Sequence, residues 1–510
     1  MRVLKIIQLV FISCVLTGCI KKTDNSQPNI VIIYADDMGY GDLNIQNPNS
    51  KIPTPHLDNL ASEGIRFTDA HSSSGICSPS RFALLTGTYH WRRQHGIVGS
   101  FGKPFFKDSD VTLPQVLKTK DYTTACIGKW HLGWDWQLKQ ESQSKEGKVN
   151  EYLPEDIDWS QPIKGGPLDR GFDYYFGDGT INFPPYTWVE NDKVLEVPTE
   201  TMTRENIGFE IKEGKWEFRP GPRVKGWNPY NVLPTLTRKT TEWINKQKGN
   251  QPFFLYFALP SPHAPIIPND EFDGKSKAGA YGDYMVQTDW VVGQVLKALK
   301  NNGFEDNTIV IFSADNGPEH YAWQRAVEYD HYSMGKFRGL KRDVWEGGHH
   351  VPLIMKWPDH IKASLVTNEV VSQVDIMATL SKIVGADLPD KAAPDSYNLL
   401  PLLNGEEYQK PLREATVHNT FDSKWGIRNG DWIYINSSSG GHRDMPEAFK
   451  NSTGYTDFDT EGILFNMKND PEQRTNLYNE YPEKIKELEA LLETYRNQGF
   501  SVNRTTTSSK

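Results

Sequence analysis

Three apolar runs that each end in a polar cluster constrain the fold of this 510-residue chain most strongly. The pairs are residues 29–34 with Asp36-Asp37, residues 252–258 with Ser261-Pro262-His263, and residues 308–312 with Asp315-Asn316. Continuous apolar runs are typical of strands that are buried on both faces of an α/β sheet, and helical patterns lie between these runs. Open α/β sheets bind ligands beyond the carboxyl ends of their strands, so we expect the three polar clusters to converge on one site.

The chain is longer than one typical domain, so we expect a second, smaller lobe in its C-terminal quarter. A Pro-flanked segment at 395–398 indicates the boundary, and we expect residues 29–405 to form the catalytic domain and residues 406–510 the second lobe. Asn-Gly within residues 425–434 predicts a hairpin, and apolar residues at helical spacing after Pro482 predict a helix packed on it. The Trp-, Pro- and Gly-rich stretch from 134 to 230 predicts long loops over the sheet.

The N-terminus has the pattern of an export signal. Arg2 and Lys5 precede an apolar run, residues 6–16, that is too short to span a bilayer as a mature helix. Residues 16–19, Leu-Thr-Gly-Cys, resemble the bacterial lipobox, which implies a signal peptide at 1–18, lipidation of Cys19 and a tether at 19–28. We therefore expect an exported protein anchored to the outer membrane by lipid alone, on its periplasmic or outer face. An ordinary signal with a chance cysteine is the alternative.

Charge and cysteine content narrow the function. The chain has 56 Lys and Arg against 65 Asp and Glu, a net charge of -9, so it has no overall basic field for nucleic acid. Of four cysteines, only Cys77 and Cys126 remain in the body after export and lipidation, which excludes a disulfide framework. A single bridge between them is an alternative in an oxidising compartment. Cys126 lies in an apolar run with strand character, however, and we expect it to pack in the core.

One segment carries a specific chemical signature. In Gly-Ile-Cys-Ser-Pro-Ser-Arg, residues 75–81, Cys77 and Arg81 bracket a proline, and Leu-Leu-Thr-Gly follows at 84–87. This pattern resembles the signature of type I sulfatases, and the second half makes the match specific. The resemblance implies that a formylglycine-generating enzyme oxidises Cys77 to formylglycine (3-oxoalanine), an aldehyde. Thr88 departs from the pattern, since many relatives have arginine there.

Other motifs extend the resemblance over nearly the whole chain, in the order of the family. It implies a metal site formed by Asp36, Asp37, Asp315, Asn316 and residue 77, and catalytic roles for Arg81, Lys129, His131, His263 and Lys341. Three carboxylates and an amide oxygen form a hard oxygen cage that suits one Ca²⁺, with Mg²⁺ a weaker match. The thiol-rich ligand set of structural zinc is missing.

The family resemblance also implies a mechanism. One hydroxyl of the hydrated formylglycine attacks sulfur while His263 protonates the departing alcohol, because an unassisted alkoxide is a poor leaving group. His131 then removes the proton of the second hydroxyl, so that sulfate departs and the aldehyde is restored. Arg81, Lys129 and Lys341 supply fixed positive charge around the sulfuryl group.

The same resemblance implies the alkaline phosphatase-like architecture, a large mixed α/β sheet flanked by helices with a smaller C-terminal α+β lobe. We expect a sulfated oligosaccharide or polysaccharide as substrate, first an algal one such as ulvan or carrageenan and second a glycosaminoglycan. Aromatic and basic residues that could contact sugar or sulfate are Trp91, Arg92, Trp134, Trp136, His349 and His350.

Other interpretations remain open. Taken singly, Asp36-Asp37 and Asp315-Asn316 are ordinary turns, and Lys129 and Lys341 are ordinary surface charges. A phosphomonoesterase or phosphodiesterase of the same fold would normally use Ser or Thr as its nucleophile and a two-metal site rich in histidine. If the protein were a hydrolase with the Cys77 thiol as nucleophile, the predicted oxygen ligands of the metal would have no function. A non-catalytic glycan-binding lipoprotein is the third alternative. The joint occurrence of the motifs favours the sulfatase.

Overall fold

A ten-stranded mixed sheet forms the centre of the computed structural model, which describes residues 27–139, 152–406, 411–421 and 423–502. Cys19 and the predicted signal peptide lie outside the described residues. The strands run in the order β13 (Leu365–Thr367), β2 (Ile65–Phe67), β12 (Leu353–Lys356), β11 (Thr308–Ala314), β1 (Asn29–Ala35), β10 (Phe253–Ala258), β4 (Thr123–Lys129), β5 (Tyr174–Gly179), β6 (Val189–Glu190) and β7 (Lys193–Val194). Strands β11 to β5 are parallel, and β12 and β6 pair antiparallel beside them, so the prediction of a large mixed sheet is confirmed.

The three apolar runs of the sequence become three adjacent strands. β1 pairs in parallel with both β10 and β11, so all three strands end at the same edge of the sheet. Just beyond that edge the backbone N–H of Asp36 donates to the carbonyl of Ser261 at 3.0 Å, and the N–H of Asp315 donates to the carbonyl of Ala35 at 3.1 Å. The predicted convergence of the polar clusters is therefore confirmed.

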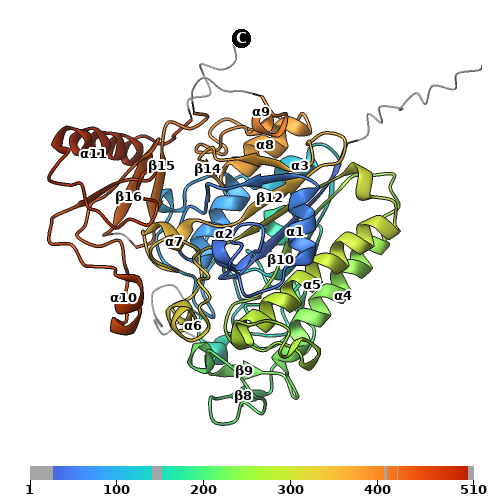
Figure 1. Cartoon of the computed structure of the whole chain (residues 1–510). Coiled ribbons are helices and arrows are strands. Elements are labelled where there is room, and N and C mark those ends of the chain that lie inside the picture. Colours follow the sequence, from blue (N-terminus) through green and yellow to red (C-terminus); the bar gives the residue numbers. More distant parts are fainter. Residues whose placement is uncertain (1–26, 140–151, 407–410, 422, 503–510) are drawn as a thin grey trace, which may run out of the picture.

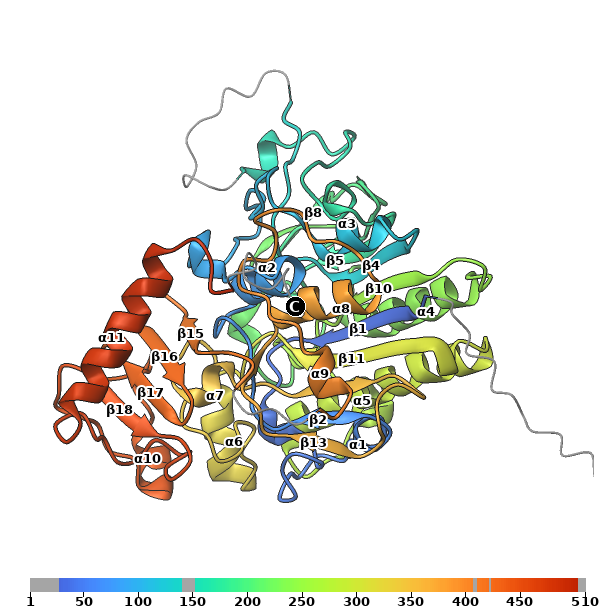
Figure 2. The same ribbon diagram turned by 90° about the horizontal axis from the view of Figure 1, so that it is seen from above.

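Helices cover both faces of the sheet (Figures 1 and 2). One face packs against α2 (Cys77–Thr86), α3 (Leu113–Lys118), α8 (Asp375–Ile383) and α9 (Leu400–Leu403), and the other against α1 (Pro55–Ser62), α4 (Val232–Asn245) and α5 (Gly279–Asn301). Side chains of β1 alternate between the two cores, with Ile30 on the α2 side and Val31 on the α5 side. This alternation explains why β1 is apolar at every position.

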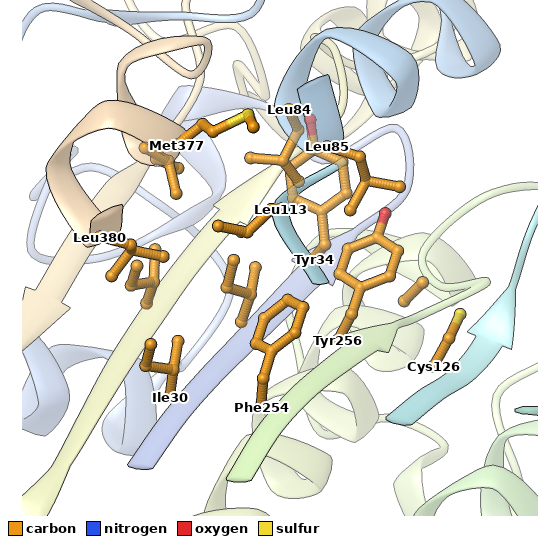
Figure 3. Packing of buried hydrophobic residues seen from close by; sticks show 14 of the residues in the cluster. Ile30, Tyr34, Leu84, Leu85, Leu113, Cys126, Phe254, Tyr256, Met377 and Leu380 are labelled. Carbon is orange, nitrogen blue, oxygen red and sulfur yellow. The ribbon is translucent and has the colours of Figure 1, made fainter. Parts of the chain in front are cut away.

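The core on the α2 side positions the N-terminus of that helix (Figure 3). All ten residues of α2 are buried, and Leu84 and Leu85 pack over Tyr34 and Tyr256 of the sheet. Cys126 lies in the same core on β4 as a free, buried thiol, which confirms the prediction that it packs in the interior. A helix that is buried along its whole length holds its first residue, Cys77, in a fixed position.

A second, antiparallel sheet forms the C-terminal part of the molecule (Figure 2). It contains β15 (Thr416–Asn419), β16 (Trp425–Asn429), β17 (Trp432–Ile435) and β18 (Ile463–Asn466), and α11 (Pro482–Asn497) packs against it. Asn429 pairs with Trp432 across the predicted hairpin, and Leu488 and Leu492 face the sheet from the predicted helix. Both predictions are confirmed, and the exact boundary at residue 406 stays a prediction.

Within the stretch from 134 to 230, the described residues 134–139 and 152–230 form mostly loops with short elements, as predicted, except that β5 joins the main sheet next to β4. The sequence of β5, Tyr-Tyr-Phe-Gly-Asp-Gly, contains two glycines. Glycine weakens the interior of a strand, so this sequence did not indicate a strand. Two further strands, β8 (Glu200–Met202) and β9 (Gly221–Arg223), form a separate ribbon. Among the described residues, no helix has the length and apolar character needed to cross a membrane.

Candidate active site

Cys77 is the first residue of α2 and is completely buried. Its Sγ lies 3.6 Å from Oδ1 of Asp36, at the end of β1. Burial raises the pKa of the Cys77 thiol, although the nearby charges of Lys129 and Lys341 act in the opposite direction. A thiol that stays protonated is a poor nucleophile. The unmodified side chain is therefore unsuited to the thiol-hydrolase alternative.

Acidic and amide side chains from two strand ends surround Cys77. The backbone N–H of Asp37 donates to Oδ1 of Asp315 at 3.2 Å, and Nδ2 of Asn316 donates to Oδ1 of Asp37 at 2.8 Å. Asp37 adopts a φ of 61°, in the left-handed region that turns the chain sharply after β1. The Oδ1 atom of Asn316 is buried and has no hydrogen-bond partner.

Three buried cations neutralise the three carboxylates. Arg81 contacts Oδ2 of Asp315 with Nε at 3.0 Å and Nη2 at 2.7 Å. Lys129 donates to Oδ2 of Asp36 at 2.5 Å. Lys341 donates to Oδ2 of Asp37 at 2.7 Å. Burying these charges is costly unless they are paired or bind charged ligands, so the arrangement indicates a functional site rather than a stability device.

The carboxylates of this cluster differ in proton affinity. Burial and the neighbouring charge of Asp36 raise the pKa of Asp315 to about 6, while Arg81 acts in the opposite direction. Burial also opposes ionisation of Asp37, but electrostatic interaction with His263 and with the charged Lys341 outweighs it and lowers the pKa of that carboxyl. Crowded carboxylates of this kind gain from a bound cation.

Two histidines complete the cluster. His263 donates from Nδ1 to the carbonyl of Ala264 at 2.5 Å, so its Nε2 lone pair faces Nζ of Lys341 at 3.1 Å. Burial lowers the pKa of His263 to about 4. Nε2 of His131 lies 3.0 Å from the carbonyl of Val98, and its Nδ1 has no partner. Burial and the charge of Lys129 lower the pKa of His131 well below its usual range, so both rings are neutral near neutral pH.

These residues fit a divalent cation. Ligand atoms of Asp36, Asp37, Cys77 and His263 all lie within 4.8 Å of one another. The unpartnered Oδ1 of Asn316 supplies a further oxygen beside them. Carboxylate and amide oxygens are the donors that hard cations prefer. The structure thus brings together the residues that the sequence analysis assigned to catalysis and metal binding. His131 lies beside them, close enough for the charge of Lys129 to affect its pKa, and its Nε2 contacts the carbonyl of Val98.

The predicted sugar-contacting residues fall into separate places. Trp134 and Trp136 line a small cavity of about 20 Å³ together with His131. Trp91 and Arg92 line a different cavity, of about 710 Å³, whose described lining includes none of the predicted catalytic residues. Arg92 also pairs with Asp395 at 2.7 Å. Sugar binding stays a prediction for all four residues, and the geometry favours the two that adjoin His131.

His349 and His350 are buried and contact other groups than the catalytic cluster. His349 stacks on His418 with ring centroids 3.7 Å apart. Nδ1 of His350 lies 3.0 Å from Oε1 of Glu346. The structure therefore does not bring these two histidines together with Cys77, and their contact with substrate stays a prediction.

Two acidic residues near the site were missed by the sequence analysis. Both carboxylate oxygens of Asp178, on β5 beside the His131 cavity, are buried without a partner, and burial raises its pKa to about 7. Glu319 has Oε2 3.4 Å from Nζ of Lys341 and accepts from Arg342 at 2.5 Å. Glu319 lies only three residues after Asn316, a spacing that could have indicated it, whereas no local pattern marks Asp178.

Comparison with known proteins places the chain in a family. The sulfatase family profile matches residues 28–386, and the profile of the N-sulphoglucosamine sulphohydrolase C-terminal region matches residues 335–498. The N-acetylgalactosamine-6-O-sulfatase of Bacteroides thetaiotaomicron is 32% identical over 95% of this chain and 97% of its own length. Together, the buried Cys77-centred site and these matches define a sulfuric ester hydrolase. The chain belongs to the type I, formylglycine-dependent sulfatase family.

Solved structures agree with this assignment. A structure from work on the metabolism of multiple glycosaminoglycans by Bacteroides thetaiotaomicron is 30% identical, covers 92% of this chain and 100% of its own, and has a TM-score of 0.77. A structure in complex with a neocarrahexaose covers 94% and 96%, with a TM-score of 0.68. Its identity is 22%, so this second likeness shows the fold alone.

Proposed function

We propose that this sulfatase removes the 6-O-sulfate of N-acetylgalactosamine residues in glycosaminoglycan-type sugars, with formylglycine at position 77 and one bound Ca²⁺. The observation that carries the substrate proposal is the 32% identity to an N-acetylgalactosamine-6-O-sulfatase over nearly the full length of both chains. The chemical proposal rests on the cluster of carboxylates, cations and neutral histidines around Cys77.

Binding of the sulfate group falls to the buried cations. Lys129 and Lys341 each reach a carboxylate next to Cys77, and Arg81 lies one turn along α2. Fixed positive charge in a buried site stabilises a sulfuryl group whose transition state spreads negative charge over its oxygens. Asp36, Asp37, Asp315, Asn316 and residue 77 would hold the Ca²⁺, which neutralises sulfate oxygens and lowers the pKa of a bound hydroxyl.

Proton transfer falls to the two histidines. When formylglycine is present, its hydrate supplies the hydroxyl that attacks sulfur. Nε2 of His263 faces Lys341 and is unprotonated in the neutral ring, so the ring must first take up a proton there, which it can then give to the departing sugar oxygen. His131 is neutral, with Nδ1 free of partners, and can take the proton of the second hydroxyl so that sulfate leaves. The two rings thus divide the acid and base work.

A line of contacts leads from Lys341 to the surface and supports a sugar-binding rim. Lys341 pairs with Glu319 at 3.4 Å, and Glu319 lies 2.7 Å from Nδ1 of His320. The His320 ring packs 5.3 Å from the ring of Trp216, which is 46% exposed. The guanidinium carbon of Arg443 lies 5.8 Å from the centre of the Trp216 ring. An exposed indole with a neighbouring guanidinium suits a sugar ring linked to an acidic sugar.

Export and lipid attachment at Cys19 are part of the same proposal. They rest on the signal-like N-terminus and the Leu-Thr-Gly-Cys sequence at 16–19. We expect metabolic labelling with a palmitate analogue to mark the full-length protein in a bacterial host. Cys19→Ala should abolish the label and release the enzyme from the membrane fraction, while equal membrane retention of that variant would contradict lipid anchoring.

A panel of sulfated sugars tests the substrate. We expect sulfate release from N-acetylgalactosamine-6-sulfate and chondroitin-6-sulfate oligosaccharides, and much less from the 4-sulfated isomers, N-acetylglucosamine-6-sulfate or carrageenan oligosaccharides. Cys77→Ala is the matched control and should release none. The algal substrate stays a prediction. Preferred release of sulfate from carrageenan or ulvan oligosaccharides would support it and contradict the present proposal. Binding without release by a chain with formylglycine at position 77 would support a glycan-binding protein instead.

A further inference from the structure

Asp178 carries a carboxylate that the proposed mechanism does not use. It lies on β5 and is 4% exposed, about as deeply buried as the two histidines of the site, His131 and His263, at 5% each. Neither Oδ1 nor Oδ2 has a hydrogen-bond partner among the described residues. Buried polar groups are nearly always hydrogen-bonded, so a carboxylate with two unpartnered oxygens needs an explanation.

The position of Asp178 is next to a lysine of the site. Strands β4 and β5 run in parallel, and Lys129 at the end of β4 pairs with Gly179, the residue after Asp178. Burial raises the pKa of Asp178 to about 7, while the charge of Lys129 acts in the opposite direction. Asp178 is therefore within electrostatic reach of a lysine that we assign to binding the sulfate group.

Lys129 does not neutralise Asp178 by direct contact, because it donates to Oδ2 of Asp36 at 2.5 Å. Asp178 instead lines a small cavity together with His131 and Trp136. Nδ1 of His131 and Nε1 of Trp136 are also buried without a hydrogen-bond partner. Unpartnered polar atoms of three residues thus belong to the lining of one cavity.

The cavity has the size of a single small polar group. Its volume is about 20 Å³, enough for one water molecule or one hydroxyl group. Trp134 and Phe183 form aromatic parts of its lining, and the Phe183 ring lies edge-to-face with the ring of His131, with centroids 5.2 Å apart. Aromatic walls with a few fixed polar groups are typical of ligand sites, where the polar groups set the orientation of the ligand.

We propose that Asp178 is a specificity-determining residue that accepts a hydrogen bond from the 4-hydroxyl of the sugar whose 6-sulfate is hydrolysed. The proposal rests on the proposed function, a sulfatase for 6-O-sulfated hexoses. In such a sugar the 4-hydroxyl is the ring hydroxyl nearest to C6, so a sugar whose sulfate contacts Lys129 can reach the neighbouring strand with it. A hydroxyl both donates and accepts, which suits the carboxylate of Asp178 and the indole N–H of Trp136.

This contact would separate two closely related sugars. N-acetylgalactosamine and N-acetylglucosamine differ only in the orientation of the 4-hydroxyl. A site that binds a hydroxyl through buried polar groups discriminates strongly against a substrate that leaves those groups unpaired. Asp178 would therefore account for the preference for N-acetylgalactosamine-6-sulfate that we expect in the panel of sulfated sugars.

A purely structural role for Asp178 predicts a different behaviour. A buried carboxylate without partners opposes folding, and replacing it with an apolar side chain of similar size is commonly neutral or stabilising. We therefore expect Asp178→Leu to unfold at the same temperature as the wild type or at a higher one. A lower unfolding temperature would indicate that Asp178 supports the fold and would count against the proposal.

Sulfate release from N-acetylgalactosamine-6-sulfate and from its 4-deoxy and 3-deoxy analogues tests the hydrogen bond itself. We expect Asp178→Leu to lower kcat/KM about a hundredfold on the parent sugar and on the 3-deoxy analogue. On the 4-deoxy analogue, the variant and the wild type should differ by less than about threefold, because the partner of Asp178 is already missing. Asp178→Asn should lose less activity than Asp178→Leu, since the amide oxygen still accepts a hydrogen bond.

Asp173→Asn is the matched control, because Asp173 directly precedes the same strand, is 38% exposed and pairs with Lys118. It should behave like the wild type on all three sugars. A loss in Asp178→Leu that persists on the 4-deoxy analogue, or full activity of this variant on the parent sugar, would overturn the assignment.

The wild type reports on the proposed function separately. If it prefers another 6-sulfated hexose, the same comparison applies to that sugar and its 4-deoxy analogue, and persistence of the loss would again overturn the role of Asp178. A wild type with formylglycine at position 77 that releases no sulfate from any 6-sulfated sugar would overturn both proposals.

Discussion

Nδ2 of Asn316 donates to Oδ1 of Asp37 at 2.8 Å, and this bond joins the ends of the neighbouring strands β11 and β1. It orients the amide so that its oxygen remains without a protein partner beside the carboxylates. Asn316 thus holds Asp37 and would offer an oxygen to the proposed calcium ion. This double role makes the residue a sensitive probe of the proposed calcium site.

Substitution Asn316→Ala should weaken calcium binding roughly tenfold to a hundredfold, since it removes one ligand and frees Asp37. Isothermal titration of the chelator-treated enzyme with Ca²⁺ measures the affinity. Chelator treatment of the wild type should abolish sulfate release, and Ca²⁺ should restore it. Asn49→Ala, at an exposed loop position, is the control. Unchanged calcium affinity in Asn316→Ala would contradict the assigned ligand set.

Substitution Lys129→Met should lower kcat/KM about a hundredfold to a thousandfold, because it removes a fixed charge from the sulfate-binding site and leaves Asp36 unpaired. Steady-state sulfate release measures the effect. Lys118→Met is the matched control, since Lys118 forms a surface pair with Asp173 and is 44% exposed. Equal activity of the two variants would show that the charge of Lys129 does not stabilise the transition state.

The identity of the leaving group should reveal the role of His263. His263→Gln should lose far more activity on a sugar sulfate than on an activated aryl sulfate, because a phenolate needs little protonation to depart. His131→Gln should impair both substrates alike and allow the sulfated enzyme to accumulate, detectable as a mass increase. A reversed pattern, with His131→Gln sensitive to the leaving group, would exchange the two roles.

Much of this site could be predicted because strand ends are local features. Asp36-Asp37 and Asp315-Asn316 each follow an apolar run directly, and parallel strands end at one edge. Burial depends on tertiary packing and could not be predicted, so the sequence did not indicate that His349 and His350 are almost fully buried beside other histidines; their contact with substrate stays a prediction. Asp178 could not be predicted either. Its strand contains two glycines and was not recognised, and the residues around it are distant in sequence.

Acid should weaken the link between the two sheets. Burial opposes ionisation of Asp69, but Arg428 and His71 outweigh it and lower the pKa of Asp69 from 3.8 to about 2. The folded pKa is below the unfolded one, so the stabilisation is fully present above about pH 5 and is lost as the pH falls through about 2. Asp69→Asn should therefore reduce the free energy of unfolding by about 2 kcal/mol near neutral pH.

Urea unfolding of wild type and Asp69→Asn between pH 7 and pH 2, in metal-free buffer, checks this prediction. The difference in free energy should be constant above about pH 5 and shrink toward pH 2. Asp108→Asn is the control, because its carboxylate is fully exposed and lies 3.7 Å from Arg170. A difference that does not change with pH would show that Asp69 acts by packing or neutral hydrogen bonds instead.

The most direct test of the account is the mass of the peptide that contains Cys77, measured after expression with a formylglycine-generating enzyme. We predict the aldehyde at position 77, and sulfate release that rises in proportion to the aldehyde fraction and is absent from Cys77→Ala. An unmodified thiol at position 77 in a chain that nevertheless hydrolyses N-acetylgalactosamine-6-sulfate would contradict the proposed nucleophile.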